Sequence, residues 1–286
     1  REKGRTISSP YGHVVNLDIR HLGEKKIDKK IPFVRELSKN YAGIDPVYEP
    51  IPVRPVVHYM MGGIDTDING ATSLPGLYAA GECACVSING ANRLGSNSLT
   101  ELLVFGSRTG KAAARFALEV PHPDKNSLEL QTADEQNRIT RNFFRKGRGT
   151  ERIFSLRKEM NETMETSAGI YRSGKSLKET CDKIKELKDR FVNIDLEDKS
   201  LNFNTELTSA LELEFMLDVA EAIAYSALKR TESRGSHQRS DFPERDDENF
   251  LKHSMAYQTN TKPHIDYKDV IITKWPPGKR VYGKEK

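Results

Sequence analysis

The sequence predicts a multi-domain chain of mixed α+β and all-α character. Helices and strands mix at its start, a three-helix bundle follows, and a small irregular domain ends it. Before residue 120, some segments have alternating or continuous apolar residues, as strands do, and others have apolar residues at helical spacing. From 153 to 229 the apolar residues recur at helical spacing only. A polar, proline-containing linker at 121–132 separates the two parts and marks a domain boundary. The length of 286 residues suffices for about two domains.

The first part is predicted to contain a strand at 14–19, where apolar residues alternate, and a helix at 26–41, where they recur at helical spacing. Gly43 is expected to end this helix. Residues 51–64 cross over into an extended segment, and residues 74–81 are expected to form a short buried strand after a Pro-Gly turn.

A long helix is predicted to start after Asn97 and to end near Glu119, just before Pro121. Ser98 and Glu101 have the spacing of a capping box, in which two side chains satisfy backbone N–H groups at a helix start. A small-residue loop precedes this helix, so we expect free N–H groups and a positive helix end there.

Three helical stripes follow, at 153–164, 177–191 and 205–229. The second is expected to open with a capping box of Ser176 and Glu179. The third is apolar on more than one side and is predicted to be the central helix of an antiparallel bundle. In the charged tail, 232–286, the clearest predicted strand is Val270–Thr273.

Composition excludes several classes of protein. Lys and Arg total 45 against 41 Asp and Glu, giving a net charge of +4 without a basic stripe, so no nucleic-acid partner is expected. The basic end, Lys279–Lys286, is interpreted as a solvated tail. Cys83, Cys85 and Cys181 form neither a disulfide framework nor a complete metal site. No apolar run approaches the roughly 18 residues that span a bilayer. The charged start without Met suggests a cut through a larger protein.

Three residues are candidates for ligand binding. Arg93 lies in the loop before the long helix, where a planar guanidinium could grip a carboxylate; an ordinary surface arginine is an equal alternative. Glu82 follows the predicted buried strand and could accept hydrogen bonds from ribityl hydroxyls, although a solvated glutamate is the commoner case. His58 lies in an apolar stretch and gains a role only if it converges on Arg93.

Together, Arg54–Ile64, Gly76–Glu82 and Gly90–Leu99 resemble the succinate dehydrogenase/fumarate reductase flavoprotein family. The resemblance continues through Gly169–Arg172, Glu232–His237 and Glu244–His253 and covers nearly the whole chain. It implies the remainder of a capping domain at 1–50, the C-terminal part of an FAD-binding α/β domain at 51–122, a helical bundle domain at 123–231 and a C-terminal domain at 232–286.

The resemblance assigns His58 and Arg93 as catalytic ligands of a substrate carboxylate, Glu82 as the contact of the FAD ribityl chain, and Ser98 with Leu99 as the helix start beside the flavin ring. It implies no metal ligand. Arg234, His237, Arg245 and His253 are expected to organise hydrogen bonds and salt bridges between domains.

Two further segments, His21–Lys26 and Val270–Gly283, resemble quinol:fumarate reductases, so fumarate reductase is favoured over succinate dehydrogenase and both over L-aspartate oxidase. A non-catalytic scaffold remains the alternative of another class. The resemblance implies fumarate and succinate as substrates, an iron–sulfur subunit and membrane anchor subunits as partners, quinol as the indirect electron donor, and a peripheral position on the cytoplasmic face of the inner membrane.

The family also uses a Gly-x-Gly-x-x-Gly segment for the FAD pyrophosphate, a histidine that tethers the flavin and an arginine that delivers a proton. The resemblance places these upstream of Arg1, in an N-terminal half. We therefore expect the 286-residue chain alone to bind no stoichiometric FAD and to reduce no fumarate.

Overall fold

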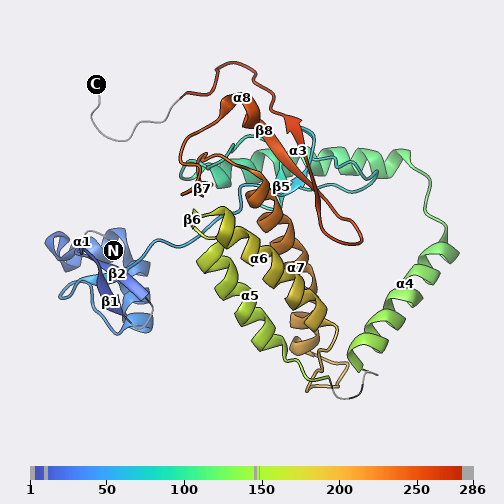
Figure 1. Cartoon of the computed structure of the whole chain (residues 1–286), viewed down its shortest axis with the longest axis horizontal. Helices are drawn as coiled ribbons and strands as arrows, with labels where there is room; N and C mark the ends of the chain where they lie inside the picture. Colours follow the sequence, from blue (N-terminus) through green and yellow to red (C-terminus); the bar gives the residue numbers. More distant parts are fainter. Residues whose placement is uncertain (1–3, 10–11, 145–146, 148, 279–286) are drawn as a thin grey trace. The chain divides into compact units, whose positions relative to one another are not determined.

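The computed structural model describes residues 4–9, 12–144, 147 and 149–278. The chain divides into two compact units, Arg1–Val57 and His58–Lys286 (Figure 1). The predicted tail Lys279–Lys286, and with it the end of the Val270–Gly283 segment, lies outside the described residues.

The first unit contains a three-stranded antiparallel sheet of β1 (Ile7–Ser9), β2 (Gly12–Leu17) and β3 (Ile51–Val53), in that order. Val15 of β2 lies opposite Val53 of β3. The strand predicted at 14–19 is confirmed as β2, although it begins and ends two residues earlier.

The single helix predicted at 26–41 is wrong. The structure has the 3-10 turn η1 (Arg20–Leu22), then α1 (Glu24–Lys30), α2 (Pro32–Leu37) and the π-helical turn η2 (Ser38–Ala42). Pro32 lacks an N–H and disfavours helical backbone at the preceding Ile31, whose φ is −141°, so the helix restarts there. Gly43 ends the segment as predicted, with a left-handed φ of 68°. Ile27 is fully buried and packs in a small core with Ile19 and Ile51.

The second unit begins with β4 (Ile64–Asp65), which pairs in parallel with β5 (Ala84–Cys85). The predicted strand at 74–81 is wrong, because this segment folds back on itself. Its N–H groups bond locally: that of Ala79 donates to the carbonyl of Gly70 at 2.9 Å, and that of Leu77 donates to Leu74 at 3.1 Å. Leu74 is also 62% exposed, so the segment is not a buried strand.

Helix α3 (Asn97–Glu119) ends where predicted and begins one residue before the predicted start, but its predicted capping box is wrong. Ser96 is the N-cap residue, in a left-handed conformation with φ of 67°, and among the described residues no side chain caps the helix. Ser98 already lies inside the first turn of the helix. The Glu101 side chain is buried and accepts a hydrogen bond from Asn89, outside the helix.

The predicted linker at 121–132 is helical over much of its length. Helix α4 (Lys125–Ile139) begins there, because the side chain of Asp124 accepts a hydrogen bond from the N–H of Ser127. The π-helical turn η3 (Thr140–Phe144) continues it. Within the described part of the chain, no helix is both long and apolar enough to cross a membrane.

Helices α5 (Ile153–Ser167), α6 (Gly174–Phe191) and α7 (Thr205–Lys229) form the predicted three-helix bundle (Figure 1). α7 packs on both of the others, and Leu156, Leu187 and Leu213 are among the buried residues of the shared core. The predicted box of Ser176 and Glu179 is wrong: Ser173, three residues earlier, caps α6 by accepting a hydrogen bond from the N–H of Ser176.

The tail is more regular than its sequence indicates. β6 (Tyr171–Arg172) pairs in parallel with β7 (Gln238–Arg239), and the short helix α8 (Asp247–Phe250) leads into a hairpin of β8 (Lys252–Tyr257) and β9 (His264–Asp269). The predicted strand Val270–Thr273 is wrong. Its partner strand begins at Lys252, opposite Asp269, so the ladder ends there.

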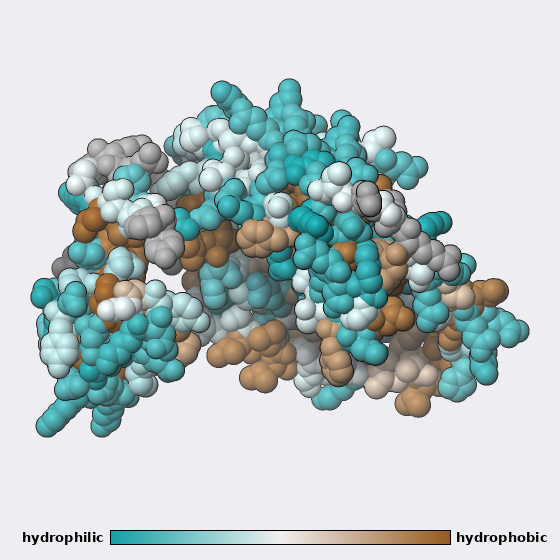
Figure 2. Space-filling view, turned by 90° about the horizontal axis from the view of Figure 1, so that it is seen from below, coloured by the Kyte–Doolittle hydropathy of each residue, from teal (hydrophilic) through white to brown (hydrophobic). Residues whose placement is uncertain are grey.

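Hydrophobic side chains also lie on the surface. Figure 2 shows several such patches within a mainly hydrophilic face. On α3 the exposed apolar residues include Leu99, Leu102 and Leu103.

Candidate functional site

Arg93 is the half-buried cation of the candidate site. Its guanidinium lies over the ring of Tyr59, 4.3 Å from the ring centroid, and its Nη1 donates to the carbonyl of Leu94 at 3.0 Å. Its Nε is buried and has no hydrogen-bond partner among the described residues. A buried unsatisfied donor on a cation costs free energy, which an anionic ligand would recover.

The segment from His58 to Met61 connects the predicted site residues. Met60 donates its backbone N–H to the Glu82 carboxylate at 3.0 Å, and the N–H of Arg93 lies 3.0 Å from the Met61 sulfur. The exposed His58 ring lies next to Tyr59, with the ring centroids 6.5 Å apart. Tyr59 therefore contacts both predicted carboxylate ligands, while no direct bond joins His58 to Arg93 within the described structure.

The start of α3 supplies an open helix end. Ser98 and Leu99 lie in its first turn, and Leu99 is 65% exposed. The N–H of Leu99 donates to the carbonyl of Ser96 at 3.2 Å. A helix end without a side-chain cap presents a positive partial charge to a ligand.

Glu101 joins the helix to the rest of the site, a role that the sequence pattern did not reveal. It is only 3% exposed, accepts a hydrogen bond from Asn89 Nδ2 at 2.7 Å, and accepts another from the Tyr59 hydroxyl at 3.4 Å. Burial raises the pKa of Tyr59, and the charge of Glu101 raises it further, so Tyr59 stays a neutral donor. The spacing of Ser98 and Glu101 in the sequence predicted a capping role instead, because spacing along one helix does not reveal contacts with residues outside it.

The site loop, residues 86–96, has no helix or strand of its own. Ser87 and Ser96, near its two ends, adopt left-handed φ values of 73° and 67°, which residues other than glycine rarely take. Ser87 Oγ lies 2.9 Å from Nε2 of His253 on β8. Both the N–H and the Oγ of Ser236 donate to the carbonyl of Ala91, at 2.9 and 2.8 Å. The C-terminal segment thus holds the loop that carries Arg93.

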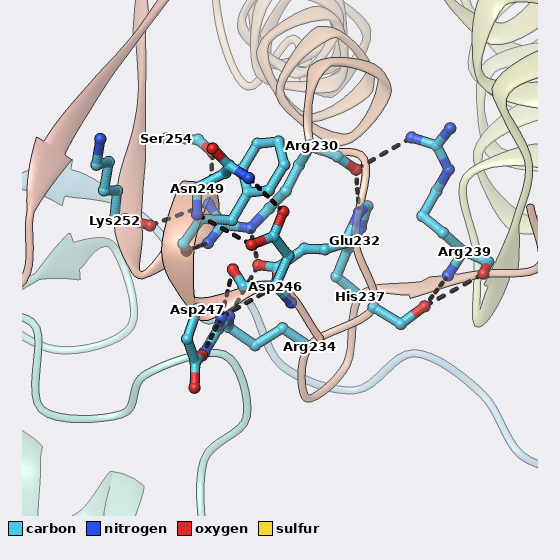
Figure 3. A network of polar contacts seen from close by, with 12 residues as sticks. Arg230, Glu232, Arg234, His237, Arg239, Asp246, Asp247, Asn249, Lys252 and Ser254 are labelled. Carbon is cyan, nitrogen blue, oxygen red and sulfur yellow. Dashed lines mark hydrogen bonds and ion pairs between the residues drawn. The ribbon is translucent and has the colours of Figure 1, made fainter. Parts of the chain in front are cut away.

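A buried carboxylate organises this C-terminal segment. Glu232 is fully buried between Arg230 and Arg234, whose Nε atoms lie 2.9 and 2.8 Å from it (Figure 3). The N–H of Asp246 donates to the same carboxylate at 2.9 Å. Arg234 also pairs with Asp247 at 2.6 Å. Each charge here is paired and hydrogen-bonded, as a buried charge must be.

His237, beside this cluster, is held neutral. Arg172 Nη1 lies 2.9 Å from its Nδ1, and because a guanidinium only donates, Nδ1 must accept. Its Nε2 then carries the proton and donates to the carbonyl of Arg230 at 3.0 Å. Burial lowers the pKa of His237 to about 4, and the positive charges of Arg172 and Arg239 add to the effect. The contacts expected between domains are seen for His237, which meets Arg172, and for His253, which meets Ser87. Arg234 and Arg245 instead pair within the C-terminal segment, both with Asp247, at 2.6 and 2.7 Å.

A flavin fits the residues at the open end of α3. An anionic pyrimidine edge would be stabilised by the helix start at Ser98 and Leu99. The exposed Glu82 carboxylate has remaining acceptor capacity for hydroxyl groups, beside its bond from Met60. Fold and helix start are therefore those expected of part of a flavin-binding protein.

Comparisons with known proteins also indicate a flavoprotein. A model of the FAD binding domain matches residues 2–99, and a model of the fumarate reductase flavoprotein C-terminal domain matches residues 157–282. The fumarate reductase flavoprotein subunit of Mycobacterium tuberculosis is 57% identical over 286 residues, or 99% of this chain and 49% of the relative. The succinate dehydrogenase flavoprotein subunit of Coxiella burnetii is 40% identical over 269 residues, or 90% and 44%. A solved quinol fumarate reductase chain of E. coli superposes with a TM-score of 0.93 at 48% identity, covering 99% of this chain and 49% of that one.

The chain belongs to the succinate dehydrogenase/fumarate reductase flavoprotein family, whose members are FAD-dependent oxidoreductases. The matching FAD-binding model supports FAD as the cofactor. The chain spans about half the length of the curated relatives it matches.

Proposed function

We propose that this chain forms part of the flavoprotein subunit of a quinol:fumarate reductase, which interconverts fumarate and succinate. The observation that carries the proposal is Arg93, a half-buried guanidinium fixed against Tyr59 with a buried Nε that the described residues leave unsatisfied. A carboxylate matches such a fixed cationic fork, and the similarity to fumarate reductase flavoproteins favours a dicarboxylate.

Arg93 and His58 would bind one carboxylate of the substrate. Arg93 offers a planar fork whose direction is limited by Tyr59 below it and by the carbonyl of Leu94 beside it. His58 is exposed next to the same tyrosine and offers a further donor. Donors fixed before the substrate arrives withdraw electron density from the carbon–carbon double bond and stabilise the charge that develops during reduction.

Ser98, Leu99 and Glu82 would hold FAD. When bound and reduced by two electrons, FAD would supply the hydride that adds to one carbon of fumarate, while a proton adds to the other carbon. The start of α3 favours negative charge on the ring that it faces, and Glu82 accepts hydrogen bonds from the ribityl hydroxyls.

We further propose that the assembled enzyme takes its electrons from an iron–sulfur subunit, with membrane anchor subunits and quinol behind it. This places the flavoprotein at the cytoplasmic face of the inner membrane as a peripheral subunit. The proposal is supported by the similarity to the E. coli quinol fumarate reductase chain.

The test uses a flavoprotein of the relatives' full length that contains this chain and is loaded with FAD. Fumarate should reoxidise a reduced viologen in its presence, and an iron–sulfur protein should co-purify with it. Oxidation of L-aspartate by dioxygen without a partner protein would instead identify an L-aspartate oxidase. Failure to bind any flavin, with partner proteins retained, would favour a scaffold.

Succinate dehydrogenase is the second candidate, favoured by the 40% identical relative from Coxiella burnetii. The greater identity to the fumarate reductase subunit, at 57%, favours fumarate reduction. The ratio of kcat/KM for fumarate with reduced viologen to that for succinate with an oxidised dye decides between them.

A further inference from the structure

We propose that Gly235 and Ser236 are positioning residues for Arg93. The turn that contains them holds the site loop at Ala91 and thereby sets where the Arg93 guanidinium meets a substrate carboxylate. This inference rests on the proposed function of Arg93 and extends it to a segment more than a hundred residues away in the sequence.

The contact at Ala91 is tight. The carbonyl of Ala91, two residues before Arg93, accepts from both the N–H and the Oγ of Ser236, at 2.9 and 2.8 Å. Gly235 has a left-handed φ of 57°, and a Cβ there would meet the Ala91 oxygen at 2.5 Å. Only a residue without a side chain allows the turn to approach this closely.

The turn is itself firmly anchored. The N–H of Arg234 donates to the carbonyl of His237 at 2.8 Å, and the N–H of His237 donates back at 3.0 Å, so Gly235 and Ser236 form the tip. Arg234 is fixed in turn by Glu232, which is fully buried (Figure 3). A path of paired contacts therefore runs from a rigid buried carboxylate to the loop that carries Arg93.

The site loop depends on such outside contacts. It has no backbone ladder of its own and carries strained φ values at Ser87 and Ser96. Besides the contacts of Arg93 itself with Met61 and Tyr59, the loop's supports include the contact of Ser87 with His253 and the bond from Asn89 to Glu101. The Ser236 bonds hold the backbone two residues before Arg93, nearer in the sequence than Ser87 and Asn89, so loss of the Ser236 hydroxyl should affect Arg93 most directly.

Ser240 provides a matched control. Its N–H and its Oγ both donate to one carbonyl, that of Arg172, at 2.8 and 3.1 Å, just as Ser236 does to Ala91. Ser236→Ala and Ser240→Ala remove equivalent hydroxyl bonds from the same segment, but only the first reaches the site loop. Ser236→Thr keeps the hydroxyl and should restore the parental behaviour.

The experiment uses the FAD-loaded, full-length flavoprotein that contains this chain. Malonate, a dicarboxylate with no double bond to reduce, is titrated calorimetrically, and KM and kcat for fumarate are measured in parallel. Ser236→Ala should raise the Kd for malonate and the KM for fumarate about three- to tenfold, the range for losing one hydrogen bond. Ser240→Ala and Ser236→Thr should stay within about twofold of the parent. Gly235→Ala should raise the Kd and the KM more than Ser236→Ala does, because the added Cβ displaces the Ala91 carbonyl directly.

Arg93→Lys separates the two hypotheses. If it weakens malonate binding about a hundredfold while Ser236→Ala behaves like Ser240→Ala, the positioning role is refuted and the role of Arg93 stands. If Arg93→Lys binds malonate normally, both ideas fail. In the Arg93→Lys background, Ser236→Ala should add less than about a twofold effect, since the two act through one contact. Fully additive losses would refute positioning even if Ser236→Ala alone loosened the fold.

Discussion

The Arg93 guanidinium lies over the ring of Tyr59, 4.3 Å from its centroid, and the Tyr59 hydroxyl donates to Glu101 at 3.4 Å. The tyrosine thus connects the cation to the first turn of α3. Its face attracts the guanidinium, and its hydroxyl is fixed by a buried carboxylate. The direction of the Arg93 fork is therefore set before any ligand arrives.

Replacing Arg93 by Lys should reduce kcat/KM for fumarate about a hundredfold, because a point charge cannot reproduce a planar bidentate fork, a loss of about 2–3 kcal/mol. Steady-state kinetics on the FAD-loaded protein measure it. Arg108→Lys is the control: Arg108 lies within α3, and it donates to the Ile68 carbonyl at 2.9 Å and to Asn69 Oδ1 at 3.2 Å, away from the predicted ligand residues. Equal kinetics for the two variants would exclude a substrate role for Arg93.

Glu232→Gln should destabilise the protein by about 3–5 kcal/mol, because removing one partner from a buried ion pair leaves uncompensated charge. Thermal and urea unfolding measure the loss. Glu197→Gln breaks an exposed pair with Arg152, at 3.2 Å, and should cost less than about 1 kcal/mol. Similar losses for the two variants would mean that Glu232 is not the anchor of the C-terminal segment.

Stability should fall as pH decreases from about 6.5 to about 4 because of His237. Its pKa is about 4 in the folded protein, against an ordinary value of 6.5, so in this interval the unfolded chain binds a proton that the folded protein does not. The contribution is about 3 kcal/mol in total and is constant above the interval. His237→Gln keeps an acceptor and a donor but does not titrate, so its free energy of unfolding should decline less between pH 7 and pH 4. An equal decline in the free energy of unfolding for the parent and for His237→Gln would contradict the assignment of a neutral His237.

Ser173→Ala should lower the free energy of unfolding by about 1 kcal/mol, the usual cost of losing an N-cap side chain. Ser173 accepts from the N–H of Ser176 at 3.1 Å. Glu179→Ala should be nearly neutral, although Ser176 and Glu179 have the capping-box spacing. If the glutamate variant proved the more costly one, α6 would begin three residues later than the structure places it.

Local patterns predicted the elements that depend on local interactions. The 205–229 stripe is α7 with those bounds, and the long helix predicted after Asn97 is α3, which begins one residue earlier than predicted. Periodicity of 3.6 residues is a property of the chain itself, so it survives in any context. The helix at 26–41 failed for an equally local reason, since Pro32 carries its own signal of a break.

Contacts between distant segments could not be predicted in this way. Glu101 has the spacing of a capping residue, and only its burial beside Tyr59 and Asn89 gives it another role. The strand at Val270–Thr273 failed because a strand needs a partner, and its neighbour's ladder starts opposite Asp269. The hydrophobicity of a segment does not reveal where the strand that would pair with it begins or ends.

By itself the sequence determined the helical periods and, through its motifs, the family, with Arg93, His58 and Glu82 as candidates. The tertiary structure alone decided that Arg93 lies on Tyr59 and that Ser236 holds Ala91 across 145 residues of sequence. The physical reason is that a motif fixes residue types and local backbone, whereas the direction of a side chain depends on which distant groups satisfy its neighbours' hydrogen bonds.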